Sequence, residues 1–185
     1  MKNREKIITL CEGAICVALA LVLSYIELSF LPNGGSVELV MIPIIIFAVY
    51  RAGAIWGVAA GVITGTLKFF LANGFAITWT SIIMDYSLAY GVVGLAGLFI
   101  NKKNGYVWGT LLGGFLRFVV HFISGITIYA ISGLSEVLWW STSSVWIFSF
   151  IYNISYMSIN TLIAVIISPL LGKALARVRK SGLRI

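Results

Sequence analysis

Long apolar runs separated by short polar segments are the feature that most restricts how this sequence can fold. A helix needs about 20 predominantly apolar residues to cross the hydrocarbon core of a bilayer. The expected spans are 7–29, 38–51, 53–72, 77–100, 106–132 and 145–172. Only 10% of the residues are charged, whereas about a quarter are charged in soluble domains. The sequence therefore predicts an all-α integral membrane protein, with one six-helix domain over 1–185.

The N-terminal run resembles a secretory signal peptide, because basic residues precede an apolar segment and Ala18-Leu-Ala20. The apolar segment continues to Ile26, which favours an uncleaved first span. Ala14 and Ala18 form a pair of small residues four apart, which allows another helix to approach closely. That helix can belong to this chain or to a partner subunit. Cys11 and Cys16 are interpreted as small packing residues.

The cationic residues fall in alternate connections between the spans. They are Lys2, Arg4, Lys6, Arg51, Lys102, Lys103, Lys173, Arg177, Arg179, Lys180 and Arg184. The connections 30–37, 72–77 and 133–144 contain neither lysine nor arginine. Because positive residues concentrate in cytoplasmic loops, this alternation predicts six helices with both termini in the cytoplasm. The net charge of +7 is thus a topology signal, and no nucleic-acid partner is expected.

Two cations lie inside the expected spans. Lys68 is one turn from the outer end of its span, where it is expected to extend to the interface. Arg117 begins a stripe of residues four apart, which continues with His121, Gly125 and Tyr129. Residues at this spacing share one helix face. Ionisable residues within a bilayer are costly and usually mark a functional site, so the stripe is a candidate binding surface.

Polar residues of three spans are expected at a similar depth. At about 1.5 Å per residue, Asp85 and Asn153 each lie about 12 Å from the outer end of their helices. Gly125 lies about 10 Å and His121 about 16 Å from the outer end. These positions predict a pocket that opens to the outside, and Asn160 is the exception to an otherwise apolar inner half.

Two carboxylates have alternative interpretations. Ser36 is a possible cap of the second helix, which would place Glu38 in its first turn as a favourable charge for the helix dipole. Glu38 is otherwise a ligand contact near the rim, as is Tyr129. Asp85 either binds a ligand or forms a structural salt bridge with Arg117.

The residue types suit a small, flat, polar, cationic molecule. Carboxylates neutralise positive charge and aromatic rings attract cations, while histidine and asparagine recognise donors and acceptors. No nucleotide-binding, metalloprotease or serine-hydrolase motif is present, so no catalytic residue is assigned. The sequence has a single histidine, so no metal site or cofactor is expected.

Several segments resemble the ThiT family, the thiamine-specific substrate-binding (S) components of energy-coupling-factor (ECF) vitamin transporters. The segments are Asn33-Gly-Gly-Ser-Val37, Met41-Ile-Pro43, Met84-Asp85-Tyr86, Leu116-Arg117-Phe118 through Gly125, and Val145-Trp146-Ile-Phe-Ser149 through Asn153. The resemblance implies capture of thiamine from outside a prokaryotic plasma membrane, and docking on an ECF transmembrane subunit with two ATPases, partly through Ala14 and Ala18. The implied substrate-binding residues are Glu38, Asp85, Tyr86, Arg117, His121, Gly125, Tyr129, Trp146 and Asn153.

The sequence also departs from this family. Asp85 stands where some members have glutamate, Phe148 where tyrosine is common, and Tyr129 where others have tryptophan or phenylalanine. The segment 132–144, with Trp139-Trp140 as a potential aromatic lid, lacks the family's Tyr-Ala-Pro-x-Gly loop. The alternatives are an S component for a thiamine precursor or another cationic heterocycle, a small self-sufficient secondary transporter, and a membrane scaffold.

Overall fold

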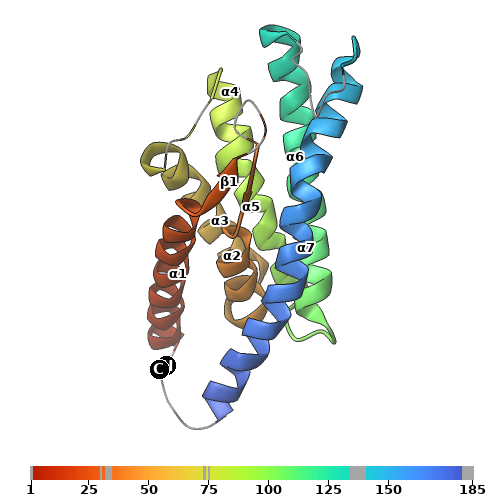
Figure 1. Cartoon of the computed structure of the whole chain (residues 1–185). Helices are drawn as coiled ribbons and strands as arrows, with labels where there is room; N and C mark the ends of the chain where they lie inside the picture. The colour runs from red at the N-terminus through yellow and green to blue at the C-terminus, as the bar shows by residue number, and fades with distance from the viewer. Residues whose placement is uncertain are drawn as a thin grey trace.

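The computed structural model describes residues 2–29, 31, 35–72, 74, 76–133 and 141–180, which form a helical bundle with one short hairpin (Figure 1). Within these residues, five helical runs are long and apolar enough to cross a membrane. They are Asn3–Ser24, Met41–Leu71, Trp79–Phe99, Gly105–Ile131 and Val145–Val178. The fold class is therefore that of an α-helical membrane protein. Trp139 and Trp140, proposed above as a lid, lie outside the described residues.

The helical runs contain several kinds of helix. The elements are α1 (Lys2–Ser24), α2 (Met41–Phe47), the π-helix η2 (Ala48–Ala52), α3 (Gly53–Leu71), α4 (Trp79–Ile82), the π-helix η3 (Ile83–Leu88), α5 (Ala89–Val93), the 3₁₀-helix η4 (Gly94–Phe99), α6 (Gly105–Ser132) and α7 (Val145–Lys180). The run from α4 to η4 thus changes its helical geometry three times. This matters for the site, because a π-helix turns the side chains that follow it to a different face.

The second helical run folds back on itself at Gly53. Gly53 has φ of 76° and ψ of −177°, a conformation that glycine adopts at little cost. A Cβ built on Gly57 would lie only 2.6 Å from the Cβ of Ala48. In one straight helix these residues would be about 13.5 Å apart along the axis. A tight turn is therefore present at Arg51-Ala-Gly53, and α3 returns beside η2.

A two-stranded hairpin connects α1 to α2. Its strands are β1 (Glu27–Ser29) and β2 (Ser36–Glu38), which pair antiparallel with Leu28 opposite Val37. Two expectations are wrong here. Residues 27–29 belong to β1 and not to the first span, because α1 ends at Ser24. Glu38 ends β2 three residues before α2 begins, and α2 has no side-chain cap, so Ser36 does not cap that helix.

Helix α3 packs unusually closely against η3, α5 and η4. A Cβ on Gly65 would lie 2.1 Å from the carbonyl oxygen of Tyr86, and a Cβ on Gly61 would lie 2.2 Å from that of Tyr90. Side chains at either position would collide with the backbone of the neighbouring helix. Gly57, Gly61 and Gly65, each four residues apart, thus form a glycine ridge for packing, which holds η3 at a fixed distance from α3.

Helices α6 and α7 lie side by side, and α1 lies at the opposite edge of the bundle (Figure 1). The main core forms where α2 meets α5 and α7, around Met41, Ile45, Tyr90 and Ala164. Helix α7 has 36 residues and is about 54 Å long, which exceeds the hydrocarbon core of about 30 Å. The start of α1 and the end of α7 lie at the same end of the molecule.

Candidate functional site

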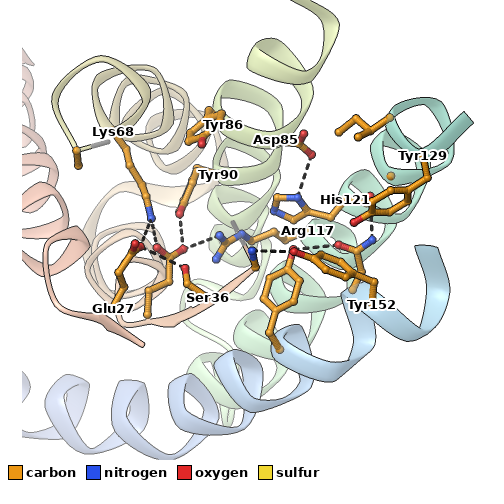
Figure 2. Close-up of a pocket in the computed structure, with 17 residues that line it drawn as sticks. Glu27, Ser36, Lys68, Asp85, Tyr86, Tyr90, Arg117, His121, Tyr129 and Tyr152 are labelled. Atoms are coloured by element: carbon orange, nitrogen blue, oxygen red, sulfur yellow. Dashed lines mark hydrogen bonds and ion pairs between the residues drawn. The ribbon is translucent and has the colours of Figure 1, made fainter. Parts of the chain in front are cut away.

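A cavity lies between the hairpin, α3, η3, α5, α6 and α7 (Figure 2). Eight of the nine substrate-binding residues expected from the sequence line it. These eight are Glu38, Asp85, Tyr86, Arg117, His121, Gly125, Tyr129 and Asn153. The elements that carry them are far apart in the chain, and the helical bundle brings them together. Depth and spacing in the sequence had only suggested that these residues lie near one another.

The π-helix η3 supplies Asp85 and Tyr86 to the cavity. A π-turn accommodates an additional residue within a helix and is frequent at functional sites. The close contact between Gly65 and the Tyr86 carbonyl fixes this turn against α3. A hydrogen bond of 2.8 Å between the hydroxyls of Thr66 and Ser87 adds a second attachment. Asp85 is therefore presented from a rigidly supported turn.

Asp85 pairs with α6 through both carboxylate oxygens. His121 Nδ1 lies 3.0 Å from Oδ1, and the Ser124 hydroxyl donates to Oδ2 at 2.8 Å. The structure thus joins Asp85 to His121, and not to Arg117 as in the structural alternative considered above. The other imidazole nitrogen, Nε2, is buried without a hydrogen-bond partner among the described residues. It is therefore available to a molecule in the cavity.

Glu38 is the centre of a buried cluster of charges. Arg117 Nη2 donates to Oε1 at 2.6 Å, and Lys68 and Tyr90 donate to the same carboxylate. Burial by itself would raise the pKa of Glu38, but Lys68 and Arg117 lower this pKa to about 2. Glu38 is therefore ionised, and two cations already compensate its charge. It lies deep in the bundle at 4% exposure, so its expected position near the rim is wrong.

Lys68 points into the protein and does not extend to the membrane interface. Its side chain is 8% exposed, it pairs with Glu38, and its Nζ lies 3.6 Å from Oε2 of Glu27 (Figure 2). The sequence-based expectation for Lys68 is wrong because β2 enters the bundle and brings a carboxylate within reach. An internal partner compensates the charge better than partial contact with headgroups would.

Arg117 lies between the Lys68 side and the His121 side of the cavity (Figure 2). Its guanidinium carbon is 4.2 Å from the centre of the Tyr90 ring, which is within the range of a cation–π contact. The residue is 3% exposed, and its Nε and Nη1 have no hydrogen-bond partner in the described part of the chain. Arg117 thus anchors Glu38 and keeps two donors unused.

The cavity has an excess of negative charge. Its described lining contains the carboxylates of Glu27, Glu38 and Asp85 and the cations Lys68 and Arg117. Three carboxylates face two lysine and arginine side chains, so one negative charge has no lysine or arginine partner. It belongs to Asp85, because the cations pair with the other two carboxylates. The arrangement favours a cation next to Asp85.

Aromatic rings form the wall opposite Asp85. Tyr129 contacts Phe148 and Tyr152 with ring centres 4.6 and 5.6 Å apart, and Tyr152 contacts Tyr156 at 5.9 Å. Tyr129 is 5% exposed and lies in this wall, three residues before α6 ends at Ser132. Stacked and edge-on rings offer a flat, electron-rich surface to an aromatic cation.

Asn153 and Gly125 join α6 to α7 at the cavity. The Asn153 amide donates to the carbonyl oxygens of His121 and Ser149 at 3.2 and 2.8 Å, and its Oδ1 accepts from the Tyr156 hydroxyl at 2.9 Å. A Cβ on Gly125 would lie 2.3 Å from the Ser149 hydroxyl. Both residues line the cavity, and both also set the distance between the two helices.

The remaining sequence-based assignments lie on the surface. Trp146 is 63% exposed and contacts Phe122 rather than the cavity, so its position does not support a place in the binding site. Ala14 and Ala18 are exposed on α1. That exposure leaves their small side chains accessible from outside the bundle, as the docking alternative requires.

Several cavity residues were not assigned to the site from the sequence. They are Glu27, Gly35, Ser36, Lys68, Ala72, Tyr90, Ile128, Tyr152 and Tyr156. For the tyrosines a signal existed, because Tyr86 and Tyr90, like Tyr152 and Tyr156, are four apart and therefore share a helix face. For Glu27, Gly35 and Ser36 no local pattern predicts that a hairpin enters a membrane bundle.

Known proteins with similar sequences and folds are thiamine transporters and ECF S components. The family described as thiamine transporter protein matches residues 10–180. The thiamine transporter ThiT of Bacillus subtilis is 30% identical over 196 residues, 98% of each chain. That of Lacticaseibacillus paracasei is 25% identical, over 90% of this chain and 88% of the relative.

Two solved structures share the fold. ThiT from Listeria monocytogenes superposes with a TM-score of 0.79 at 24% identity, covering 94% of this chain and 97% of that one. The S component of a bacterial ECF transporter superposes with a TM-score of 0.64 at 15% identity, covering 97% and 99%.

Proposed function

This chain belongs to the thiamine transporter family, and from that premise we propose that it is the thiamine-binding S component of an ECF transporter. It captures thiamine from the outer side of the membrane, and a partner module with two ATPases drives uptake. The family consists of transporters and not of enzymes. The sequence-based assignment of transport and the absence of an assigned catalytic residue agree with this membership.

The observation that carries the proposal is the uncompensated carboxylate of Asp85 in an aromatic cavity. Thiamine contains a thiazolium ring with a permanent positive charge and a neutral aminopyrimidine ring. Asp85 supplies the opposite charge, and the tyrosines of the cavity wall supply surfaces for flat rings. The free Nε2 of His121 and the free donors of Arg117 provide hydrogen-bonding groups for the polar substituents.

The proposed arrangement in the membrane is one domain that crosses it six times, with both termini in the cytoplasm. The reversal at Gly53 supports two crossings within the run Met41–Leu71. The common end reached by the start of α1 and the end of α7 (Figure 1) supports termini on one side. The lysines and arginines near those ends support a cytoplasmic location for that side, and the proposed membrane is the plasma membrane of a prokaryote.

The proposed docking surface for the ECF transmembrane subunit includes Ala14 and Ala18. Both are exposed on α1, which lies at the edge of the bundle away from α6 and α7 (Figure 1). Small side chains four apart allow a second helix to approach closely within a bilayer. Docking there leaves the cavity wall formed by α6 and α7 free to hold the ligand.

The test is thiamine binding to the purified protein, followed by quenching of tryptophan fluorescence and by calorimetry. We expect saturable binding of one thiamine per chain. We expect Asp85→Asn to weaken it about tenfold to hundredfold, because an interaction with a charged group contributes about 1.5–3 kcal/mol. Glu12→Gln is the matched control, since Glu12 pairs with Arg51 away from the cavity.

Two results would overturn parts of this proposal. No binding at micromolar thiamine excludes thiamine as the ligand, and a thermal-shift series with the pyrimidine precursor and other cationic heterocycles then identifies the class that binds. Normal thiamine binding by Asp85→Asn shows instead that Asp85 has a structural role and that the cation is held elsewhere.

A further inference from the structure

Asn160 makes two hydrogen bonds that attach the hairpin to α7. Its Oδ1 accepts from the backbone N–H of Glu38 at 2.7 Å, and its Nδ2 donates to the backbone carbonyl of Ser36 at 3.0 Å. Asn160 is 1% exposed and lies outside the cavity lining. Both hydrogen bonds join it to backbone atoms of β2, so it acts on the position of the strand.

The carboxamide of Asn160 pairs with β2 as a neighbouring strand would. In a strand, the N–H of one residue and the carbonyl of the residue two before it point to the same edge. One edge of β2 pairs with β1, and the other presents the Glu38 N–H and the Ser36 carbonyl to α7. Only one orientation of the amide matches this donor and acceptor, so the two hydrogen bonds define the register of β2 against α7.

The strand that Asn160 holds carries part of the cavity. Ser36 and Glu38 both line it, and Glu38 in turn engages Lys68 and Arg117. A shift of β2 would therefore move the charged cluster and open the cavity between β2 and α7. Tyr152 adds one further attachment, because its hydroxyl accepts from the Gly35 N–H at 2.9 Å.

We propose that Asn160 is a positioning residue that keeps β2 closed against α7 and thereby slows the release of the bound ligand. This inference rests on the proposed function, because it concerns the same cavity, but the position of β2 can be measured without a ligand. Because Asn160 lies outside the cavity lining, its effect is on the lifetime of the complex more than on the chemistry of recognition.

The first experiment measures hydrogen exchange of the backbone amides in ligand-free protein. We expect Asn160→Leu to accelerate exchange in the peptide that contains residues 35–38, while peptides of α6 keep wild-type protection. Ser168→Ala is the matched control, because Ser168 is also fully buried on α7 but its hydroxyl has no partner in the described part of the chain. Unchanged exchange at 35–38 in Asn160→Leu would refute the attachment.

The second experiment measures thiamine dissociation by stopped-flow chase with excess unlabelled ligand. We expect Asn160→Leu to accelerate dissociation on the order of tenfold, since two buried hydrogen bonds are lost. Asn160→Asp provides the conservative rescue: its protonated carboxyl presents the same acceptor and donor as the amide. The ratio of its dissociation rate to the wild-type rate, measured at each pH, should therefore approach one as the pH falls. Glu38, Lys68 and Arg117 are present in both proteins, so their titration cancels in this ratio.

The two experiments separate the possible failures. Faster exchange at 35–38 without thiamine binding to any variant refutes the proposed function and leaves the attachment of β2 intact. Faster exchange with an unchanged dissociation rate refutes the role in ligand release. If Asn160→Leu does not fold, Asn160→Asp supplies the test, because a dissociation rate that exceeds the wild-type rate by the same factor at every pH contradicts the inference.

Discussion

At the scale of single residues, the cavity separates two kinds of buried charge. Glu38, Lys68 and Arg117 compensate one another, and a buried pair of this kind fixes structure more than it adds stability. Asp85 instead faces the imidazole of His121 and the hydroxyl of Ser124. Its charge remains for a ligand, whereas the charge of Glu38 does not.

This difference predicts that loss of a partner of Glu38 lowers the stability of the fold. Lys68→Met should lower the free energy of unfolding by about 3 kcal/mol, because it leaves Glu38 buried with one cation fewer. Thermal unfolding in detergent measures the effect. Arg51→Met is the control, since it breaks the partly exposed pair with Glu12, for which about 1 kcal/mol or less is expected. An equal loss of unfolding free energy in the two variants would show that the buried pair of Lys68 and Glu38 stabilises the fold no more than the partly exposed pair does.

At the scale of elements, the π-helix η3 and the glycine ridge of α3 together position the side chains of Asp85 and Tyr86. The ridge permits α3 to contact the backbone at Tyr86 and Tyr90. The π-turn of η3 directs Asp85 and Tyr86 to the cavity. A regular α-helix over residues 79–99 would rotate the two side chains relative to the packed face, because a π-turn contains an additional residue. The binding geometry therefore depends on residues that never contact the ligand.

Gly65→Ala tests this dependence. Its methyl group would meet the Tyr86 carbonyl at 2.1 Å, so η3 must move away from α3, and such overpacking costs about 1–3 kcal/mol. We expect thiamine affinity to fall together with thermal stability. Gly13→Ala is the control, because its methyl group meets only the ring of Phe47, at 3.0 Å, far from η3. Wild-type affinity in Gly65→Ala would show that η3 tolerates displacement.

Sequence reasoning predicted the helical elements and part of the site for an identifiable reason. Asp85, His121, Gly125 and Asn153 lie on long helices, so distance along the chain converts to depth, and the structure places all four in one cavity. Glu38 and Lys68 were misplaced because their positions depend on the hairpin, whose entry into the bundle is set by long-range contacts. The π-turns were not predicted either, since they arise from packing between helices.

At the scale of the whole molecule, the cavity and the proposed docking surface lie in different parts of the bundle. Asp85 and His121 are held by η3 and α6, whereas Ala14 and Ala18 are on α1. Ligand binding and docking are therefore separable by mutation. A change in one part should leave the function of the other intact unless it destabilises the entire bundle.

Ala14→Trp and Ala18→Trp should abolish thiamine uptake in cells that contain the partner module, because a bulky side chain prevents close helix approach. Thiamine binding by the purified variants should equal that of wild type. Leu162→Trp is the control, since Leu162 is 61% exposed and belongs to α7 rather than to α1. Normal uptake by both alanine variants would place the docking surface elsewhere.

The buried cluster around Glu38 also has a consequence for how the protein is made. Lys68 and Arg117 each lie in a segment that must enter the bilayer, where an unpaired cation is strongly disfavoured. Glu38 precedes Lys68 by only 30 residues, so the two can pair while the chain is still leaving the ribosome. Arg117 follows Glu38 by 79 residues and can find its partner only after the earlier helices have assembled. Insertion of α6 therefore depends on a hairpin that is already in place, which gives biogenesis a defined order.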